Sequence, residues 1–365
     1  MARIADGGRP GVLAQWQTWV PYAAAVFSVI YGGFGLFWAL GGPGFPFGEV
    51  NDPSAALTPF PTATAAVGGP VIAGLGLLGA LVGLAMARGL GGGVFPAILV
   101  GFAWLVALGL VVVVPDYRPL LGLAYTPIIV IGAPFDWPPD VGLLDVLPWP
   151  VVNQLVCMAG GLLWAGAGLA YWRRVGDACG YCGRSDRPAR WTTSDAARRW
   201  GRWATGVAIT VPLLYAATRY LWALGVPFGI SEQFLREGQA MGLWWAGAAL
   251  ATLAVGGAGL TFGLIQPWGE VFPRWIPLLG GRRVPISLAV IPAALVSVLV
   301  TSAGLMFVRL VLTGGLTDVF VFAEDLGWGA LAPELLWPVW GVALATATLA
   351  YHYRRRGRCR HCGRL

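Results

Sequence analysis

The feature of this sequence that most constrains its fold is a series of apolar blocks, each about 20 residues long. A helix of about 20 apolar residues crosses the ~30 Å hydrocarbon core of a bilayer. Eight such blocks occur, at residues 18–40, 66–87, 95–115, 147–172, 203–224, 240–263, 286–311 and 333–353. Only 11% of the residues are charged, about half the share in a typical soluble domain. The pattern predicts an all-α polytopic membrane protein with eight transmembrane helices.

A ninth apolar stretch, at residues 119–134, contains Pro119, Pro127 and Pro134. Because proline removes a helical hydrogen bond, we interpret this stretch as a re-entrant or interfacial segment. The first block lacks a clear small-x-small cleavage site, so we expect it to stay in place as a transmembrane helix.

The distribution of arginine predicts how the helices are oriented, because cytoplasmic loops of membrane proteins carry an excess of basic residues. All 24 basic residues are Arg, and 20 of them fall on one side if the eight blocks cross in turn. The other four are Arg118, Arg219, Arg236 and Arg309. We therefore expect both termini to be cytoplasmic. The net charge of +7 is then a topology signal and does not indicate nucleic-acid binding.

The two halves of the sequence carry matching segments, which predicts an internal repeat. Residues 169–171 and 179–184 match residues 349–351 and 359–364 without a gap, at an offset of 180. Three shorter matches occur in the same order: Tyr31 and Trp38 with Tyr215 and Trp222, Gly79-x-x-x-Gly83 with Gly259-x-x-x-Gly263, and 94–96 with 271–273. We interpret the glycine pairs as helix-packing faces, since small residues let helices approach closely in lipid.

Each half has four predicted helices, so both halves enter and leave the membrane on the same side. We therefore expect a parallel 4+4 repeat. Residues 1–184 form the first four-helix repeat, residues 185–202 a cytoplasmic linker and residues 203–365 the second repeat. Each repeat ends in a Cys-x-x-Cys knuckle.

Four of the five cysteines form two Cys-x-x-Cys-Gly motifs, placed after the fourth and eighth helices. Two thiolates at this spacing hold half of a tetrahedral metal site, and two motifs together complete it. We predict one structural zinc ion bound by Cys179, Cys182, Cys359 and Cys362. Iron in a rubredoxin-like site and unmetallated thiols are the alternatives, while a reducing cytosol disfavours disulfides. We interpret Cys157 as an apolar packing residue.

Other cofactors have little support in the sequence. The only histidines are His352 and His361, so no bis-histidine haem site can form across helices. Walker, His-x-x-x-His and Gly-x-Ser-x-Gly motifs do not occur, which argues against nucleotide, zincin and hydrolase chemistry.

A second candidate site contains charged residues within the predicted spans, which are the usual functional candidates in membrane proteins. Arg219 and Arg309 lie in the outer parts of the fifth and seventh blocks, and Tyr215 and Trp222 lie about one turn from Arg219. These four residues predict an anionic ligand site, with Glu232 or Asp318 as an acidic neighbour. The alternative is that each arginine reaches the outer headgroups.

Two segments mix tryptophan with arginine: 267–275 with 281–285, and the run Arg219-x-x-Trp222-Ala-Leu-Gly-x-Pro-x-Gly229. They resemble blocks in uncharacterised multi-pass membrane proteins of high-GC actinobacteria, mainly over the second half of the chain. The resemblance implies a bacterial plasma membrane and no assigned activity.

Three classes of function are compatible with these features. We favour a non-catalytic integral membrane protein that binds a lipid, a hydrophobic small molecule or a membrane protein partner. The first alternative is a small-molecule or lipid transporter, which requires a polar cavity at mid-membrane. The second is a membrane-embedded enzyme or an iron-dependent redox protein, which requires polar groups that converge near one face.

Overall fold

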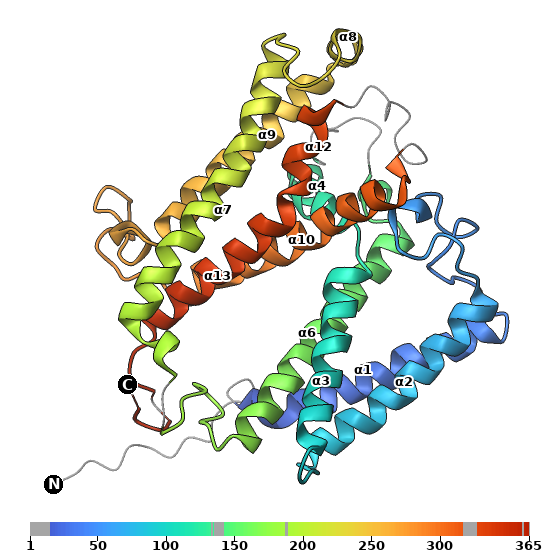
Figure 1. Ribbon diagram of the computed structural model, residues 1–365, viewed down its shortest axis with the longest axis vertical. Helices are drawn as coiled ribbons and strands as arrows, with labels where there is room; N and C mark the ends of the chain where they lie inside the picture. The colour runs from blue at the N-terminus through green and yellow to red at the C-terminus, as the bar shows by residue number, and fades with distance from the viewer. Residues whose placement is uncertain are drawn as a thin grey trace.

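The computed structural model describes residues 15–132, 134, 142–186, 189–316, 327–359 and 361–364. These residues form helices joined by loops (Figure 1). The first half contains α1 (Trp16–Ala39), α2 (Ala65–Ala87), α3 (Phe95–Leu108), α4 (Arg118–Gly132), α5 (Leu143–Val146) and α6 (Trp149–Val175). The second half contains α7 (Ser194–Ala223), α8 (Glu232–Ala240), α9 (Leu243–Gly263), α10 (Ile286–Thr313), α12 (Trp328–Leu335) and α13 (Trp337–Arg355). Shorter turns are the 3-10 helices Ala55–Leu57, Arg190–Thr192 and Pro267–Gly269, and the π-helix Gly109–Val113 that continues α3.

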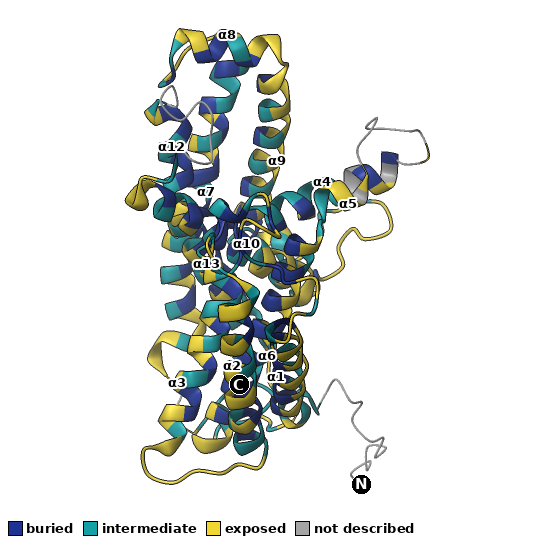
Figure 2. Cartoon of the chain, turned by 90° about the vertical axis from the view of Figure 1, so that its right-hand side faces the viewer, coloured by how far each residue is buried: buried dark blue, intermediate teal, exposed yellow. Residues whose placement is uncertain are grey.

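Within the described part of the chain, seven helical stretches are long and apolar enough to cross a membrane. They are α1, α2, α3 with its π-helical end, α6, α9, α10, and α12 together with α13. Exposed residues occur along these helices (Figure 2), and many are large and apolar: Leu77 and Leu105 are 65% and 71% exposed. These features fit the predicted all-α polytopic membrane protein, because lipid is the medium that such surfaces contact.

The fifth predicted span, α7, is a helix of 30 residues but is not among the seven. It contains Arg219 and several threonines, so it is less apolar than the other long helices. The predicted number of eight crossings therefore stays a prediction.

The proline-containing stretch at residues 119–134 is mostly α4, a helix of 15 residues that continues through Pro127. The expected break at Pro127 is therefore wrong. At 1.5 Å per residue this helix is ~22 Å long, shorter than the ~30 Å core that it would have to cross. Its length agrees with a segment that does not span, whether re-entrant or interfacial.

The long helices pack in two groups of four (Figure 1). In the first group α1 packs on α2 and α6, and α3 packs on α6. In the second group α7 packs on α9 and α13, and α10 packs on α13. The first helix of each group thus contacts the second and fourth, and the third contacts the fourth.

Glycine allows close packing between α1 and α2. A Cβ atom built on Gly76 would lie 2.5 Å from the Cα of Gly32, so the two backbones touch. Gly79 and Gly83 also face α1, as predicted for a packing pair. Their counterpart Gly259 has no atom within 4 Å of a built Cβ, so the second glycine pair does not form an equivalent face.

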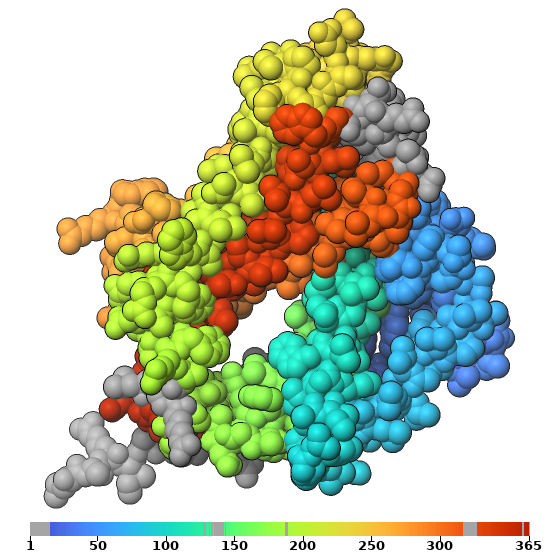
Figure 3. Space-filling model, viewed as in Figure 1, coloured from blue at the N-terminus to red at the C-terminus, as the bar shows by residue number. Residues whose placement is uncertain are grey.

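The two groups contact each other at both ends of the molecule. At one end α10 packs on α4 and on the π-helix that ends α3, where the Ser302 hydroxyl donates a hydrogen bond of 2.8 Å to the Pro115 carbonyl. At the other end the two cysteine loops meet. Between these contacts Figure 3 shows an opening through the molecule, bounded by α3, α6, α7 and α13.

Candidate metal centre

The two Cys-x-x-Cys-Gly motifs follow α6 and α13 and form the same tight loop. In the first, the Cys179 N–H donates to the Arg184 carbonyl at 2.9 Å, and the Gly183 N–H donates to the Cys179 carbonyl at 2.7 Å. The residues at equivalent positions in the second loop make the same two bonds, both 2.9 Å long. Gly183 has φ +70° and Gly363 has φ +71°, a left-handed conformation that glycine adopts without strain. The glycine after each cysteine pair is therefore required by the turn.

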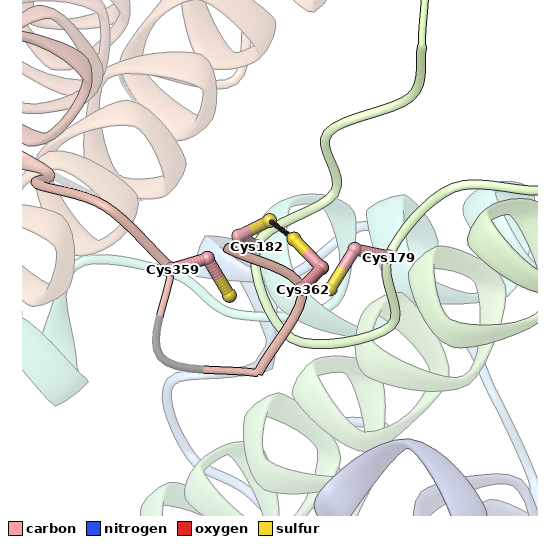
Figure 4. A group of neighbouring side chains, drawn as sticks. All are labelled: Cys179, Cys182, Cys359 and Cys362. Carbon is pink, nitrogen blue, oxygen red and sulfur yellow. Dashed lines mark hydrogen bonds between the residues drawn. The ribbon is translucent and has the colours of Figure 1, made fainter. Parts of the chain in front are cut away.

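The four cysteine sulfurs converge from these two loops (Figure 4). All lie within 4.8 Å of one another, and the Sγ atoms of Cys182 and Cys362 are 3.6 Å apart. Sulfurs at the corners of a tetrahedral zinc site with ~2.3 Å bonds are separated by ~3.8 Å. All four are free thiols and are half-buried. The predicted group of Cys179, Cys182, Cys359 and Cys362 is confirmed as a cluster that could hold one metal ion.

Residues at matching positions also hold the two loops together. An Nη1 of Arg184 donates to the Arg364 carbonyl, and an Nη1 of Arg364 donates to the Arg184 carbonyl, each at 2.9 Å. The rings of Tyr181 and His361, which occupy the same place between the two cysteines, lie with centroids 4.0 Å apart. These reciprocal contacts relate the loops by a local twofold axis. The His361 ring packs at a tilt against the Tyr181 ring at this axis, which gives it a packing role beside the sulfurs.

Further guanidinium groups surround the sulfurs. Arg173 donates to the Gly180 carbonyl at 2.8 Å, and Arg356 donates to the Cys182 carbonyl at 3.4 Å. Four thiolates around a divalent ion carry a net charge of about −2. The positive charge of these arginines therefore stabilises a metal–thiolate group at this place.

The loops differ in how easily each thiol ionises. The two backbone N–H groups that follow Cys359 in its loop lower its pKa to about 6. Burial opposes ionisation of Cys179, but the backbone N–H groups that follow it outweigh this effect and lower its pKa. Burial, reinforced by hydrogen bonds with the neighbouring thiols, raises the pKa of Cys182 to about 12. A divalent cation supplies the positive charge that allows adjacent sulfurs to ionise together.

The second predicted site is centred on Arg219, which forms an ion pair with Glu334. Its guanidinium also lies over the rings of Trp222 and Tyr215, at 4.3 and 4.6 Å from their centroids. The predicted neighbourhood of aromatic rings is therefore present. The acidic neighbour is Glu334, whereas Glu232 pairs with exposed Arg236 at 3.9 Å and Asp318 lies outside the described residues.

Arg309 does not contact Arg219 in any described interaction. It donates to the Leu57 carbonyl and lines a cavity of about 180 Å³ where the two helix groups meet, together with Ser302 and Met306. The structure thus separates the two arginines that the sequence analysis combined. The cavity is smaller than the ~300 Å³ of the smallest usual ligand pockets.

A buried polar network that the sequence did not predict joins two loop residues, the start of α4 and α6. Arg118 donates to the carboxylates of Asp52 and Asp116 at 2.7 to 2.8 Å, and Gln154 donates to Asp116 at 2.8 Å. Asp52 and Asp116 are 3% and 1% exposed, so the ion pairs with Arg118 offset part of the cost of burying these carboxylates. The Asp116-x-Arg118 spacing next to an apolar helix was the available signal, although Asp52 comes from a loop 66 residues away.

Comparison with known protein families, with curated proteins and with solved structures finds no match to this chain. The four-cysteine cluster is therefore the starting point for a functional proposal.

Proposed function

We propose that this chain is a non-catalytic integral membrane protein of eight spans, built as a parallel 4+4 repeat whose halves are clamped by a structural zinc ion. The observation that carries the proposal is that the four sulfurs, two from each half, lie within 4.8 Å of one another. Neither half has enough ligands to close a tetrahedral site alone. A metal ion bound here ties the end of α6 to the end of α13.

Matching contacts in the two groups of helices support the repeat. The Tyr171 hydroxyl donates to the Leu90 carbonyl at 2.7 Å, and the Tyr351 hydroxyl donates to the Gly269 carbonyl at 2.6 Å. Both tyrosines lie on the fourth helix of their group, and both acceptors follow the second helix. These contacts add to the shared packing order and to the reciprocal bonds of the cysteine loops.

The eighth crossing depends on α7. It packs along α9, which is a candidate span, and α8 connects the two at one end. A helix of 30 residues is ~45 Å long, enough to cross the hydrocarbon core. Pairing of Arg219 with Glu334 removes much of the cost of placing a charge in that span.

Zinc is proposed over iron because four thiolates in tetrahedral arrangement form the usual closed structural zinc site. A rubredoxin-like iron uses the same ligands, and it is the alternative that would make the chain a redox protein. The two metals are distinguished by spectroscopy, since an iron–thiolate centre absorbs visible light and d¹⁰ zinc does not.

The proposed role in the membrane is to bind a lipid, a hydrophobic molecule or a membrane partner. The opening between the two helix groups supports this role, because a gap between membrane-spanning helices is filled by lipid or by a partner (Figure 3). A transporter is less well supported. Among the described residues, the cavity where α10 meets the other half is only about 180 Å³, and its lining is mostly apolar.

Metal analysis of the purified protein tests the clamp. We expect one zinc per chain, with loss of that zinc in the Cys179→Ser/Cys359→Ser double variant. Cys157→Ala, which removes a buried thiol in α6, is the control and should retain the metal. Iron in place of zinc, absence of bound metal, or full zinc content in the double variant would contradict the proposal.

The crossing by α7 is tested with single cysteines introduced at its two ends. Ser185 precedes α7, and Gln233 lies on α8 beyond it. Under the proposal, a membrane-impermeant thiol reagent labels Gln233→Cys in intact cells but labels Ser185→Cys only after the cells are broken. The unmodified chain gives the background. Labelling of both positions from the same side would mean that α7 does not cross, and seven spans would remain.

A further inference from the structure

Two hollows meet at the start of α7, on the face that the proposed topology assigns to the cytoplasm. One is charged and lies between the beginning of α7, the end of α9 and the end of α13. The other is apolar and follows α7 away from that end. Arg202 lines both of them, so they form one continuous surface.

The charged hollow has a volume of about 560 Å³ and is lined by five arginines and one acidic residue. Arg354 pairs with that acid, Glu270, at 2.8 Å. Arg355 is occupied by bonds to backbone carbonyls and to the Tyr351 hydroxyl. The three remaining arginines of the hollow are exposed and form no ion pair or side-chain hydrogen bond within the described part of the chain. They are Arg198, Arg202 and Arg283. The hollow thus has unneutralised guanidinium groups on several sides, an arrangement that suits a phosphate group.

The apolar hollow has a volume of about 910 Å³. Its lining residues include Trp203, Val207, Val211, Leu214 and Leu336. From Arg202 to Leu214 the helix rises ~18 Å at 1.5 Å per residue, close to the ~15 Å depth of one leaflet of the hydrocarbon core. The exposed indole of Trp203, next to Arg202, lies where tryptophan favours the boundary between headgroups and acyl chains.

We infer that this combined surface is a binding site for one anionic phospholipid of the inner leaflet. The headgroup phosphate lies among Arg198, Arg202 and Arg283, and an acyl chain follows the groove beside α7. A soluble anion would leave the groove unused, and a zwitterionic lipid would leave the excess positive charge uncompensated. The inference rests on the proposed eight-span arrangement, in which α7 crosses the inner leaflet.

The first test is titration of the purified, metal-loaded full chain in detergent with phosphatidylglycerol, with bound lipid counted by native mass spectrometry. Since a lost charge-assisted hydrogen bond to phosphate costs about tenfold in affinity, Arg202→Gln/Arg283→Gln should raise the Kd at least about tenfold. Arg274→Gln/Arg282→Gln removes the same number of charges from the loop that carries Arg283, but at positions outside the hollow. It should leave the Kd within about twofold, since exposed charges contribute little.

The second test blocks the groove. Neither Gly206 on α7 nor Gly257 on α9 has an atom within 4 Å of a built Cβ, so both accept a larger side chain. Only Gly206 lines the groove. Gly206→Phe should weaken phosphatidylglycerol binding, while Gly257→Phe should not. Equal effects of the two substitutions would overturn the assignment of the groove to an acyl chain.

The remaining outcomes decide the ligand. If the two double arginine variants lose the same affinity for phosphatidylglycerol, lipid is attracted only to a basic face in general, and the site is overturned. Equal affinity of the unmodified chain for phosphatidylcholine would overturn it in the same way. If inorganic phosphate at millimolar concentration competes with phosphatidylglycerol for binding, the ligand of this site is a soluble anion and the lipid assignment is overturned. Zinc content and cysteine labelling report on the eight-span arrangement separately, so a failed lipid site and a failed topology give different results.

Discussion

The ion pair of Arg219 and Glu334 gives the sharpest prediction about the helix bundle. The two side chains are only 11% and 8% exposed, and they join α7 to α12. The perturbation is a double-mutant cycle of Arg219→Gln, Glu334→Gln and the combined variant. Gln has the same shape as Glu, and in place of Arg it leaves a shorter, uncharged amide. The cycle subtracts the separate effect of each substitution and so isolates the interaction between the two side chains.

The magnitudes follow from what each substitution leaves behind. Arg219→Gln strands the Glu334 carboxylate, and removing one partner of a buried pair costs about 3–5 kcal/mol. The same substitution loses the cation–π contacts with Trp222 and Tyr215, which are worth about 0.5–2 kcal/mol each. Glu334→Gln keeps those contacts, so we expect a loss of about 3 kcal/mol, the low end for such a pair. The double variant strands no charge and should lose less than the sum of the two single variants.

The assay is the free energy of unfolding from SDS titration in mixed micelles, followed by circular dichroism. Arg236→Gln is a matched control, because Arg236 and Glu232 form an exposed pair with side chains 73% and 76% exposed. Removing such a pair should cost less than about 1 kcal/mol. If Arg219→Gln costs no more than Arg236→Gln, Arg219 reaches the headgroups and the buried-pair interpretation is wrong.

Three further predictions concern the metal and the helix packing. Removal of the metal with a strong chelator, or the substitution Cys179→Ser, should lower the melting temperature more than it changes lipid binding, because the proposed ion ties two helix ends together. An unchanged melting temperature would contradict a clamp. Metal retention should fall as the pH drops through about 6, since the pKa of Cys359 is lowered from 9.0 to about 6 and protons then compete with the metal for the thiolate. Retention measured by dialysis at pH 5 equal to that at pH 8 would argue against thiolate ligands. Gly76→Ala should cost about 1–3 kcal/mol of unfolding free energy by overpacking against Gly32, whereas Gly74→Ala, which faces open space on the same helix, should cost nothing measurable by the same titration.

The apolar blocks predicted the long helices well because length and hydropathy are local properties of the sequence. The block at 95–115 corresponds to α3 with its π-helical end, and the block at 333–353 corresponds largely to α13. The π-helix itself was not predicted. Its closing bond runs from the Val114 N–H to the Gly109 carbonyl, and the Val112 carbonyl accepts a bond from Ser302, which lies 190 residues away. A contact so distant leaves no trace in the local pattern.

The cysteine cluster could be predicted because the two motifs share the Cys-x-x-Cys-Gly pattern and recur at an offset of 180 residues. The acidic partner of Arg219 was harder to predict from the sequence, because it depends on which helices pack together. Glu334 is 115 residues away from Arg219 and lies at the edge of the predicted span 333–353. The pairing that the structure contains requires α12 to lie beside α7, and helical periodicity does not encode that arrangement.

The candidate metal ligands lie in the two loops that follow α6 and α13. Each loop offers two sulfurs, which is half of a tetrahedral site. The two loops, related by a local twofold axis, together offer four sulfurs, and the reciprocal bonds of Arg184 and Arg364 hold the loops in that relation. The helix groups otherwise touch mainly where α10 meets α4 and the end of α3. Under the proposal, a metal ion at the cysteine loops would join the two helix groups at the end opposite the α10 contact, and so would limit changes in the angle between them.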